Sequence, residues 1–282
     1  MEILTDTKIR ELQIKANEIR ISIIEMLMEA GSGHTAGAMG LADIFTYLYF
    51  HAMKHNPKDP FWPDRDRLIL SNGHVCPVLY ASMAHSGYFP VEELLTLRKF
   101  GSRLQGHPHR EFLPMLETSS GPLGEGLSQT VGMALADRMD GIKDRFFYCS
   151  MGDGELNEGE VWEAVMLAGK EKLDNIISFI DRNYIQIDGN TEDIMPLEPL
   201  SDKWKSFNWH VIEADGHDFK SLNEAFKEAK NAKGKPIVII AKMIPGKGIK
   251  EIEGNYKWHG MPPNKEQGVR FLEELRIIGG RL

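Results

Sequence analysis

The fold class is decided by residues 146–154, which read Phe-Phe-Tyr-Cys-Ser-Met-Gly-Asp-Gly. A short apolar run of this kind is typical of a strand that is covered on both faces in a parallel sheet. Two further runs lie at residues 176–180 and 237–240. Between the first two runs, residues 158–172 carry apolar side chains at helical spacing, which predicts a strand–helix–strand unit. We therefore expect an α/β fold with a doubly wound, mostly parallel sheet and helices on both faces.

Apolar periodicity predicts further helices on either side of this unit. They cover residues 7–29, 41–49, 200–207 and 219–232. Gly31 is placed to end the first of these helices, and Asp218 is placed to cap the last. Residues 101–125 and 245–263 are rich in turn-forming residues, and loops of that length in a compact domain are usually functional.

The composition limits the class of partner. The chain has 282 residues, with 33 Lys and Arg against 41 Asp and Glu and a net charge of −8. The length alone fits one or two domains, and the sheet pattern favours one domain over residues 1–282. An acidic chain without a basic block argues against nucleic-acid or anionic-membrane binding, but it leaves room for a local site that takes a small anion.

The termini and cysteines indicate a cytoplasmic protein. Residues 1–6 are charged and lack the apolar core of a signal peptide. The longest apolar runs are far shorter than the roughly 20 residues that span a bilayer. The two cysteines, Cys76 and Cys149, are widely separated, which fits a reducing compartment.

Two oxygen-bearing side chains follow neighbouring predicted strands. Asp153 lies directly after the first run and Asn183 follows the second. Because parallel strands bring their carboxyl ends to one edge, these side chains and a backbone carbonyl just after Asn183 offer hard ligands for Mg²⁺ or Ca²⁺. Gly152 and Gly154 would let the backbone approach a diphosphate, with the N-terminus of the following helix facing the anion. Taken alone, the Gly-Asp-Gly tripeptide also fits a simple turn at a strand end.

The longer strings around these residues are more specific. They are Gly-Asp-Gly-Glu-Leu-Asn-Glu-Gly at residues 152–159, then Trp162-Glu163-Ala164, and Asp-Arg-Asn-Tyr-Ile-Gln-Ile-Asp-Gly at residues 181–189. Together they resemble the thiamine diphosphate motif in the amino-terminal domain of transketolases. The resemblance implies thiamine diphosphate and Mg²⁺, with Ca²⁺ or Mn²⁺ as substitutes. It implies a metal site made of Asp153, the Asn183 side chain and the Ile185 carbonyl, and cofactor contacts from Gly154 and Ile187.

Four histidines that adjoin glycine match active-site loops of the same family. The resemblance implies that His34, His107 and His259 contact sugar hydroxyls and act in catalysis, and that His74 and His259 reach the cofactor diphosphate. A fifth, His217, matches a strand-to-helix turn, and no chemistry is assigned to it. For any single histidine, a surface or core position remains the alternative.

Two loops carry further detail of the resemblance. Gly121, Pro122 and Leu123 match the segment that transketolases place against the aminopyrimidine ring of the cofactor. The first histidine loop, residues 33–37, reads Gly-His-Thr-Ala-Gly and departs from the commoner Gly-His-Pro-Gly. That departure bears on substrate contacts around His34 and leaves the cofactor assignment intact.

The resemblance covers only the first of the three transketolase domains. In the family a Glu of the pyrimidine-binding domain activates the cofactor, and no Glu of this sequence matches that motif. We therefore expect the pyrimidine-binding and C-terminal domains to be absent here and to come from a separate C-terminal subunit, in a symmetric heterotetramer. The expected reaction transfers a two-carbon ketol unit from a ketose (phosphate) to an aldose (phosphate).

Two alternatives remain open from the sequence. One keeps the split architecture and changes the chemistry, as in a 1-deoxyxylulose 5-phosphate synthase or a transketolase for a sulfonated or branched sugar. The other is a cofactor-binding remnant with a regulatory role and no catalysis of its own.

Overall fold

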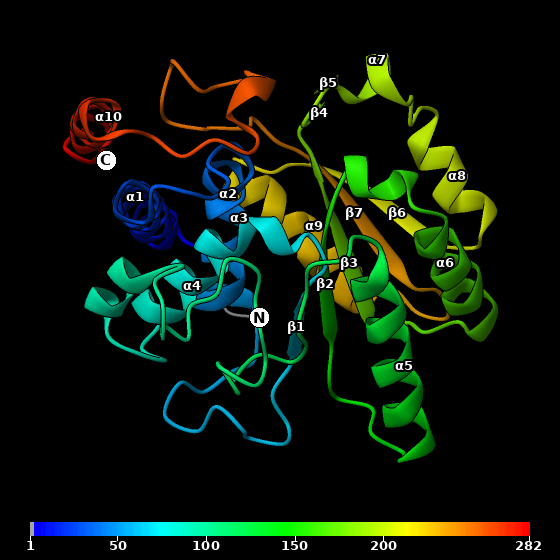
Figure 1. The fold of residues 1–282 in the computed structure, drawn as a ribbon. Helices are drawn as coiled ribbons and strands as arrows, with labels where there is room; N and C mark the ends of the chain where they lie inside the picture. Colours follow the sequence, from blue (N-terminus) through cyan, green and yellow to red (C-terminus); the bar gives the residue numbers. More distant parts are fainter. Residues whose placement is uncertain (1–2) are drawn as a thin grey trace.

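A five-stranded parallel sheet forms the centre of the computed structural model, which describes residues 3–282 (Figure 1). Its order is β1-β2-β3-β7-β6, and every neighbouring pair is parallel. The strands are β1 (Arg67–Leu70), β2 (Phe147–Gly152), β3 (Ile176–Arg182), β6 (His210–Asp215) and β7 (Ile237–Lys242). The predicted α/β fold is confirmed. Met1 and Glu2 belong to the segment whose sequence argued against a signal peptide, and both lie outside the described residues.

The two edge strands, β1 and β6, were not predicted. Each has a neighbouring strand on one side only, and β6 alternates buried and exposed residues toward its end. β1 is only four residues long. Neither strand shows the continuous apolar run that marks β2, β3 and β7, because an edge strand does not need one.

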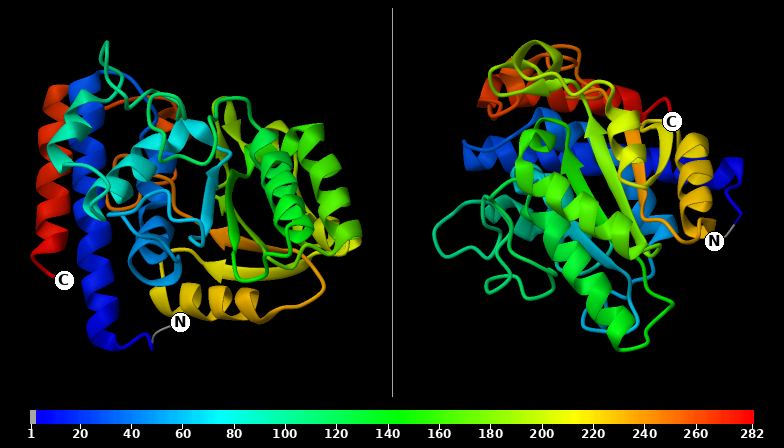
Figure 2. Two further views of the ribbon diagram at one scale, coloured as in Figure 1. Left: turned by 90° about the horizontal axis from the view of Figure 1, so that it is seen from below. Right: turned by 90° about the vertical axis from the view of Figure 1, so that its right-hand side faces the viewer.

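Helices cover both faces of the sheet, as expected. One face carries α1 (Asp6–Ala30), α2 (Ala36–Gly40), α3 (Ala42–Tyr47), α4 (Cys76–His85), α9 (Phe219–Asn231) and, outermost, α10 (Lys265–Gly279); the other carries α5 (Glu125–Met139), α6 (Gly159–Glu171) and α8 (Leu200–Ser206) (Figure 2). Side chains of β3 alternate between the two cores. Ile177 and Phe179 enter the first, and Ile176 and Ile180 enter the second.

Short elements complete the chain. They are the π-helical turn η1 (Leu48–Ala52), the 3₁₀ turns η2 (Gly73–Val75), η3 (Val91–Thr96), η4 (Gly154–Asn157) and η5 (Tyr256–Trp258), the small ribbon β4 (Ile185–Gln186) with β5 (Gly189–Asn190), and α7 (Thr191–Ile194). The predicted long loops are largely irregular, with only η5 inside the second.

The predicted helix boundaries agree with the local chemistry. Thr5 caps α1 by accepting the Lys8 N–H, and Gly31 ends it in a left-handed conformation with φ 63°. Asp218 caps α9 through the Lys220 N–H, as predicted. α10 was not predicted; it begins at a capping box in which Asn264 and Gln267 bond each other's backbone N–H groups.

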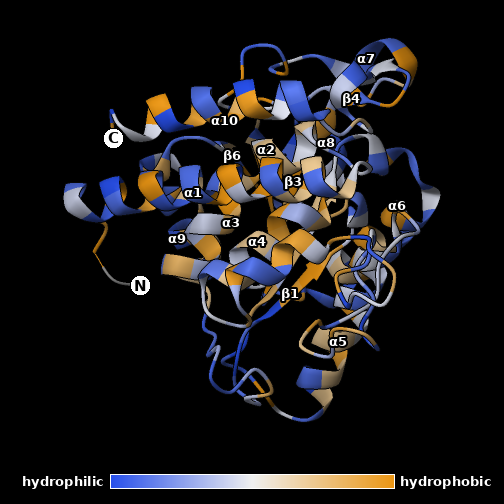
Figure 3. Ribbon diagram, turned by 60° about the vertical axis from the view of Figure 1, so that its left-hand side comes forward, coloured by the Kyte–Doolittle hydropathy of each residue, from blue (hydrophilic) through white to orange (hydrophobic). Residues whose placement is uncertain are grey.

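The long helices α1 and α10 lie side by side (Figure 2). The Asn17 side chain of α1 donates to the Leu275 carbonyl of α10 at 2.9 Å. Hydrophilic and hydrophobic segments alternate along both helices, as expected for helices with one buried stripe (Figure 3). Within residues 3–282, none of the helices combines the length and apolar character needed to cross a membrane.

Candidate active site

The carboxyl ends of the strands open into a cavity of about 390 Å³. Every predicted site residue except Pro122 lines it. The predicted residues in the lining are His34, His74, His107, Gly121, Leu123, Asp153, Gly154, Asn183, Ile185, Ile187 and His259. Pro122 is exposed and lies outside the lining, although its two neighbours reach the cavity. The topology therefore gathers residues from separate segments of the chain into one site.

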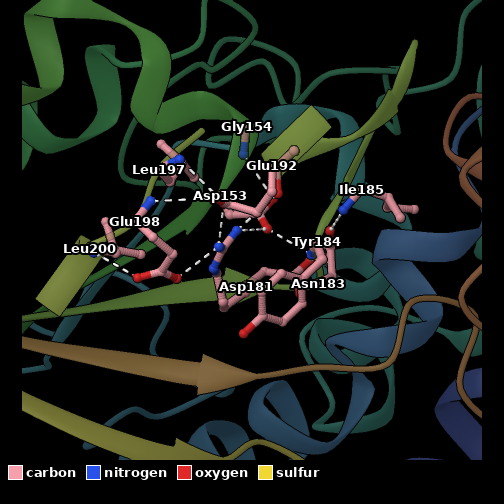
Figure 4. A network of polar contacts seen from close by, with 12 residues as sticks. Asp153, Gly154, Asp181, Asn183, Tyr184, Ile185, Glu192, Leu197, Glu198 and Leu200 are labelled. Atoms are coloured by element: carbon pink, nitrogen blue, oxygen red, sulfur yellow. Dashed lines mark hydrogen bonds and ion pairs between the residues drawn. The ribbon is translucent and has the colours of Figure 1, made fainter. Parts of the chain in front are cut away.

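Asp153 follows β2 and is fixed by hydrogen bonds on both carboxylate oxygens (Figure 4). Oδ1 accepts the Gly154 N–H at 2.8 Å. Oδ2 accepts the Tyr184 N–H at 2.7 Å and the Arg182 Nη1 at 3.0 Å. Asp153 is 1% exposed, so its orientation is set entirely by these partners.

Asn183 follows β3 and is oriented by its neighbours. Its Nδ2 donates to Asp181 Oδ2 at 2.8 Å, and its Oδ1 accepts the Ile185 N–H at 3.0 Å. Because Asp181 can only accept from the amide nitrogen, it fixes which end of the amide is oxygen. The amide oxygen is thereby held on the side of Ile185.

The charges at this edge fit a divalent cation. Burial raises the pKa of Asp153 to about 6, against the lowering effect of the Tyr184 N–H and the Arg182 guanidinium. Burial, followed by the charge of Asp153, raises the pKa of Asp181 well above its usual range. Asp153 and Asp181 are therefore two neighbouring buried carboxyl groups with little positive charge near them. A bound cation would stabilise their charged forms.

The candidate metal ligands at this edge are oxygen atoms. No cluster of three or more His, Cys, Asp or Glu side chains that could hold a metal occurs among residues 3–282. The fitting donors are one carboxylate, one amide oxygen and one backbone carbonyl, all hard oxygen ligands. Such a set leaves coordination positions for phosphate oxygens.

Arg182 is a site residue that the sequence reasoning missed. Its guanidinium also contacts Thr191 Oγ1 at 2.9 Å, Glu192 at 2.6 Å and Glu198 at 2.9 Å. It stacks over the Tyr184 ring at 4.0 Å. Arg182 thus links the Asp153 carboxylate to the segment around α7. The signal was a charged residue beside Asn183, at the end of a strand that is buried throughout.

Polar groups without partners face the region where a diphosphate is expected. Asn72 Oδ1, Gln186 Nε2 and Asp181 Oδ1 are buried without a hydrogen-bond partner, and all three residues line the cavity. Buried polar atoms are normally satisfied, so unpaired ones in a cavity indicate a polar ligand. We expected the N-terminus of the helix after Asp153 to face the diphosphate. This expectation is wrong for the residues next to Asp153, because the 3₁₀ turn η4 follows Asp153 and α6 begins only at Gly159.

The four predicted histidines form one cluster. The His34 ring centroid lies 5.0 Å from that of His74, 5.7 Å from that of His259 and 6.5 Å from that of His107. His74 and His259 are 5.0 Å apart. His34 is therefore central, and its Nδ1 is buried without a partner.

The cluster holds its rings neutral. Burial, then the charges of His259, Arg98 and His107, lowers the pKa of His34 to about 4. Burial is also the first cause that lowers the pKa values of His74, His107 and His259. Neutral imidazoles can each donate and accept a hydrogen bond, which suits contacts to a ligand that carries hydroxyl groups.

Arg98 contacts the loop of His107, and the sequence analysis did not predict this role. It has a positive φ of 60°, and its Nη2 donates to the Gly106 carbonyl at 3.3 Å, next to His107. A Cβ on Gly106 would lie 2.6 Å from the Arg98 guanidinium carbon. No periodicity could reveal this contact, because it joins two irregular segments.

Glu155 fixes the loop that contains Gly121. Its buried carboxylate accepts the Gly124 N–H at 2.8 Å and the Gly152 N–H at 2.9 Å, and it also bonds the Ser71 hydroxyl. Ser71 follows β1, Gly152 ends β2 and Gly124 precedes α5, so Glu155 joins three different elements. Glu155 lies inside the family motif, but no local pattern around it indicates that it would join them.

Comparisons with known proteins identify the family of the chain. The family described as "Transketolase, thiamine diphosphate binding domain" matches residues 12–275. A 6-deoxy-6-sulfo-D-fructose transketolase subunit of a Clostridium species is 44% identical and aligns over 95% of this chain and 98% of its own length. An apulose-4-phosphate transketolase subunit of Phocaeicola vulgatus is 37% identical, with 98% and 96% covered.

Longer transketolases match through part of their length. Human transketolase is 38% identical over 95% of this chain, which corresponds to 42% of the human protein. The structure of Leishmania mexicana transketolase superposes with a TM-score of 0.89 at 36% identity, covering 95% of this chain and 41% of that one. The chain belongs to the transketolase thiamine diphosphate-binding domain family.

Proposed function

We propose that this chain is the amino-terminal, diphosphate-binding subunit of a two-subunit transketolase. The observation that carries the proposal is the single cavity in which Asp153, Asn183 and Ile185 meet the cluster of four histidines. Two relatives named as transketolase subunits align with this chain over nearly their whole length, which supports a subunit role.

In this proposal the metal and diphosphate are held by the sheet edge. Asp153, the Asn183 amide oxygen and the Ile185 carbonyl would bind Mg²⁺, while Gly154, His74 and His259 would contact the diphosphate. Gly121 and Leu123 would contact the aminopyrimidine ring, and Ile187 would also contact the cofactor. Thiamine diphosphate, when bound, supplies the carbon centre that takes up and releases the two-carbon unit.

The histidines would act on the sugars. His34, His107 and His259 are neutral near pH 7 because their pKa values are lowered, so each can accept a proton from a sugar hydroxyl or hold that hydroxyl in place. A well-placed acid or base contributes about 10² to 10⁴ in rate.

A separate C-terminal subunit would complete the site by supplying the activating Glu. We further propose a symmetric assembly with two copies of each chain. A groove between α5 and α6 is a candidate face for a contact between chains, and its lining includes apolar residues such as Val131 and Leu167 beside Glu160 and Glu163. The two cysteines are free and buried, which supports a cytoplasmic location.

The sugar pair defines the second candidate function. The 44% identity to a relative named for a sulfonated ketose favours testing such a donor beside the sugar phosphates. A donor panel should contain xylulose 5-phosphate, fructose 6-phosphate, 6-deoxy-6-sulfo-D-fructose and apulose 4-phosphate. If the complex accepts only one class of these donors, that class identifies the donor substrate of the reaction.

Co-purification and cofactor binding test the proposal together. Tagged chain isolated from its own cells should carry a second chain with a pyrimidine-binding domain, identified by mass spectrometry. The complex should bind thiamine diphosphate in calorimetry only with Mg²⁺, and Asp153→Asn should weaken binding at least about tenfold. Asp174→Asn is the matched control, because Asp174 bonds the Gly234 N–H at the opposite end of the sheet. Undiminished binding by Asp153→Asn would refute the assigned metal site.

A further inference from the structure

The segment from Met243 to Pro263 carries His259 and has almost no regular structure. After β7 it contains only the short turn η5. Its position is therefore set by individual contacts with the rest of the molecule, and not by a helix or sheet ladder. Three of these contacts link the segment to His217 and to the loop of His34.

The first contact lies where the segment leaves β7. The Ile244 N–H donates to His217 Nε2 at 2.7 Å, and His217 Nδ1 lies 2.7 Å from Asp43 Oδ2. Because Nε2 accepts, the proton of a neutral ring is on Nδ1 and faces Asp43. Asp43 also pairs with Arg20, so the start of the segment is tied to a buried charge network.

The second and third contacts join the segment to the loop of His34. The Gly246 N–H donates to the Ala36 carbonyl at 2.8 Å. The Thr35 hydroxyl donates to the Met261 carbonyl at 2.6 Å. Thr35 is fully buried, next to His34 in sequence, and its acceptor is two residues from His259. This bond is the only side-chain hydrogen bond that joins the two histidine loops among the described residues.

The two rings depend on this backbone arrangement. His34 and His259 meet edge to face at 89°, with centroids 5.7 Å apart. A Cβ on Gly260 would lie 3.7 Å from two atoms of the His34 ring, so the backbone beside His259 packs on that ring. His34 Nδ1 has no hydrogen-bond partner of its own. Ring placement therefore relies on how the two loops are held together.

We infer that Thr35 is a positioning residue that sets the relative placement of His34 and His259 through its bond to the Met261 carbonyl. Thr35 occupies the position where this chain departs from Gly-His-Pro-Gly, and a proline there has no hydroxyl to donate. The inference about ring placement holds for the chain itself. Its effect on sugar transfer rests on the proposed function.

The test removes the hydroxyl while keeping the shape of the side chain. Thr35→Val deletes the bond, Thr35→Ser retains it, and Thr130→Val is the matched control. Thr130 is equally buried and its hydroxyl donates to the Gly126 carbonyl at 2.7 Å, but it lies in α5 and outside the cavity lining. Histidine ring resonances are recorded by NMR on chain labelled with ¹³C-histidine and assigned with single histidine substitutions.

We expect Thr35→Val to shift the His34 and His259 ring resonances, and Thr35→Ser to restore them. Thr130→Val should leave both unchanged despite losing a similar hydrogen bond. With the partner subunit, kcat/KM should fall at least about tenfold in Thr35→Val, since small misplacements of reacting groups cost up to about 10²-fold. Thr35→Ser and Thr130→Val should stay within about twofold of the unmodified chain.

The two readouts separate the inference from the proposed function. Unchanged His34 and His259 resonances in Thr35→Val, or equal shifts in Thr130→Val, would overturn the positioning role. Shifted resonances in a complex that transfers no sugar would uphold the positioning role and count against the proposed function alone. If Thr35→Val does not fold, Thr35→Ala removes the same hydroxyl with less strain and is read in the same way.

Discussion

The Arg182 guanidinium lies 3.0 Å from Asp153 Oδ2, and both side chains are almost fully buried. The same guanidinium also pairs with Glu192 and Glu198. One arginine therefore pairs with three carboxylates and orients the one expected to bind the metal. Removing it leaves Asp153 buried without a counter-ion.

We predict that Arg182→Met lowers the free energy of unfolding of the isolated chain by about 3–5 kcal/mol, as loss of one partner of a buried ion pair does. Urea unfolding followed by tryptophan fluorescence measures the loss. Arg138→Met is the control, because Arg138 pairs with Glu171 at the surface with half of its side chain exposed. That change should cost less than about 1 kcal/mol. Equal losses in the two variants would show that Arg182 does not stabilise this edge of the sheet.

A second prediction concerns Glu155. Glu155→Ala leaves the buried Gly124 and Gly152 N–H groups without an acceptor, and we expect a loss of about 3 kcal/mol or more in unfolding free energy. Glu155→Gln keeps one acceptor oxygen and should lose less. Glu224→Ala, at an exposed position of α9, should change stability by less than about 0.5 kcal/mol. If Glu155→Ala were as stable as Glu224→Ala, the hydrogen bonds from Glu155 to Gly124 and Gly152 would not stabilise the fold.

The pH dependence of stability follows from His34. Its pKa is lowered from 6.5 to about 4 in the folded chain, chiefly by burial and then by the charges of His259, Arg98 and His107. The unfolded chain therefore binds more protons at this residue between those two values. The contribution of His34 to stability is fully present above pH 6.5 and is lost as the pH falls toward 4.

We expect His34→Asn to show a shallower fall in unfolding free energy than the unmodified chain as the pH is lowered through this window. Urea unfolding at several pH values measures both slopes. Ser206→Ala, a non-titrating change at an exposed position at the end of α8, should keep the original slope. A parallel slope for His34→Asn would mean that His34 titrates normally in the folded chain.

The fold could be predicted where burial dictates the sequence. β2, β3 and β7 are covered on both faces and show continuous apolar runs, so they were found within a residue or two. β1 and β6 lie at the edges, where polar residues such as Arg67, His210 and Glu213 are tolerated, and no periodic signal marked them.

The candidate site divides in a similar way. Residues that would touch the cofactor, such as Asp153 and Asn183, lie in short strings that resemble a family, and the structure brings them together in one cavity. Residues that hold those strings in place were missed. Thr35, Arg98, Glu155 and Arg182 act through contacts between distant segments, and only the three-dimensional structure brings those segments together.

The central claim is that this chain supplies one half of a transketolase site. The most direct measurement is the rate of ketol transfer, with thiamine diphosphate and Mg²⁺ present, for this chain alone, for its co-purifying partner alone and for an equimolar mixture. We predict negligible transfer by either chain and rapid transfer by the mixture, abolished by Asp153→Asn in this chain. Turnover by this chain alone, or no transfer by the mixture with any donor of the panel, would contradict it.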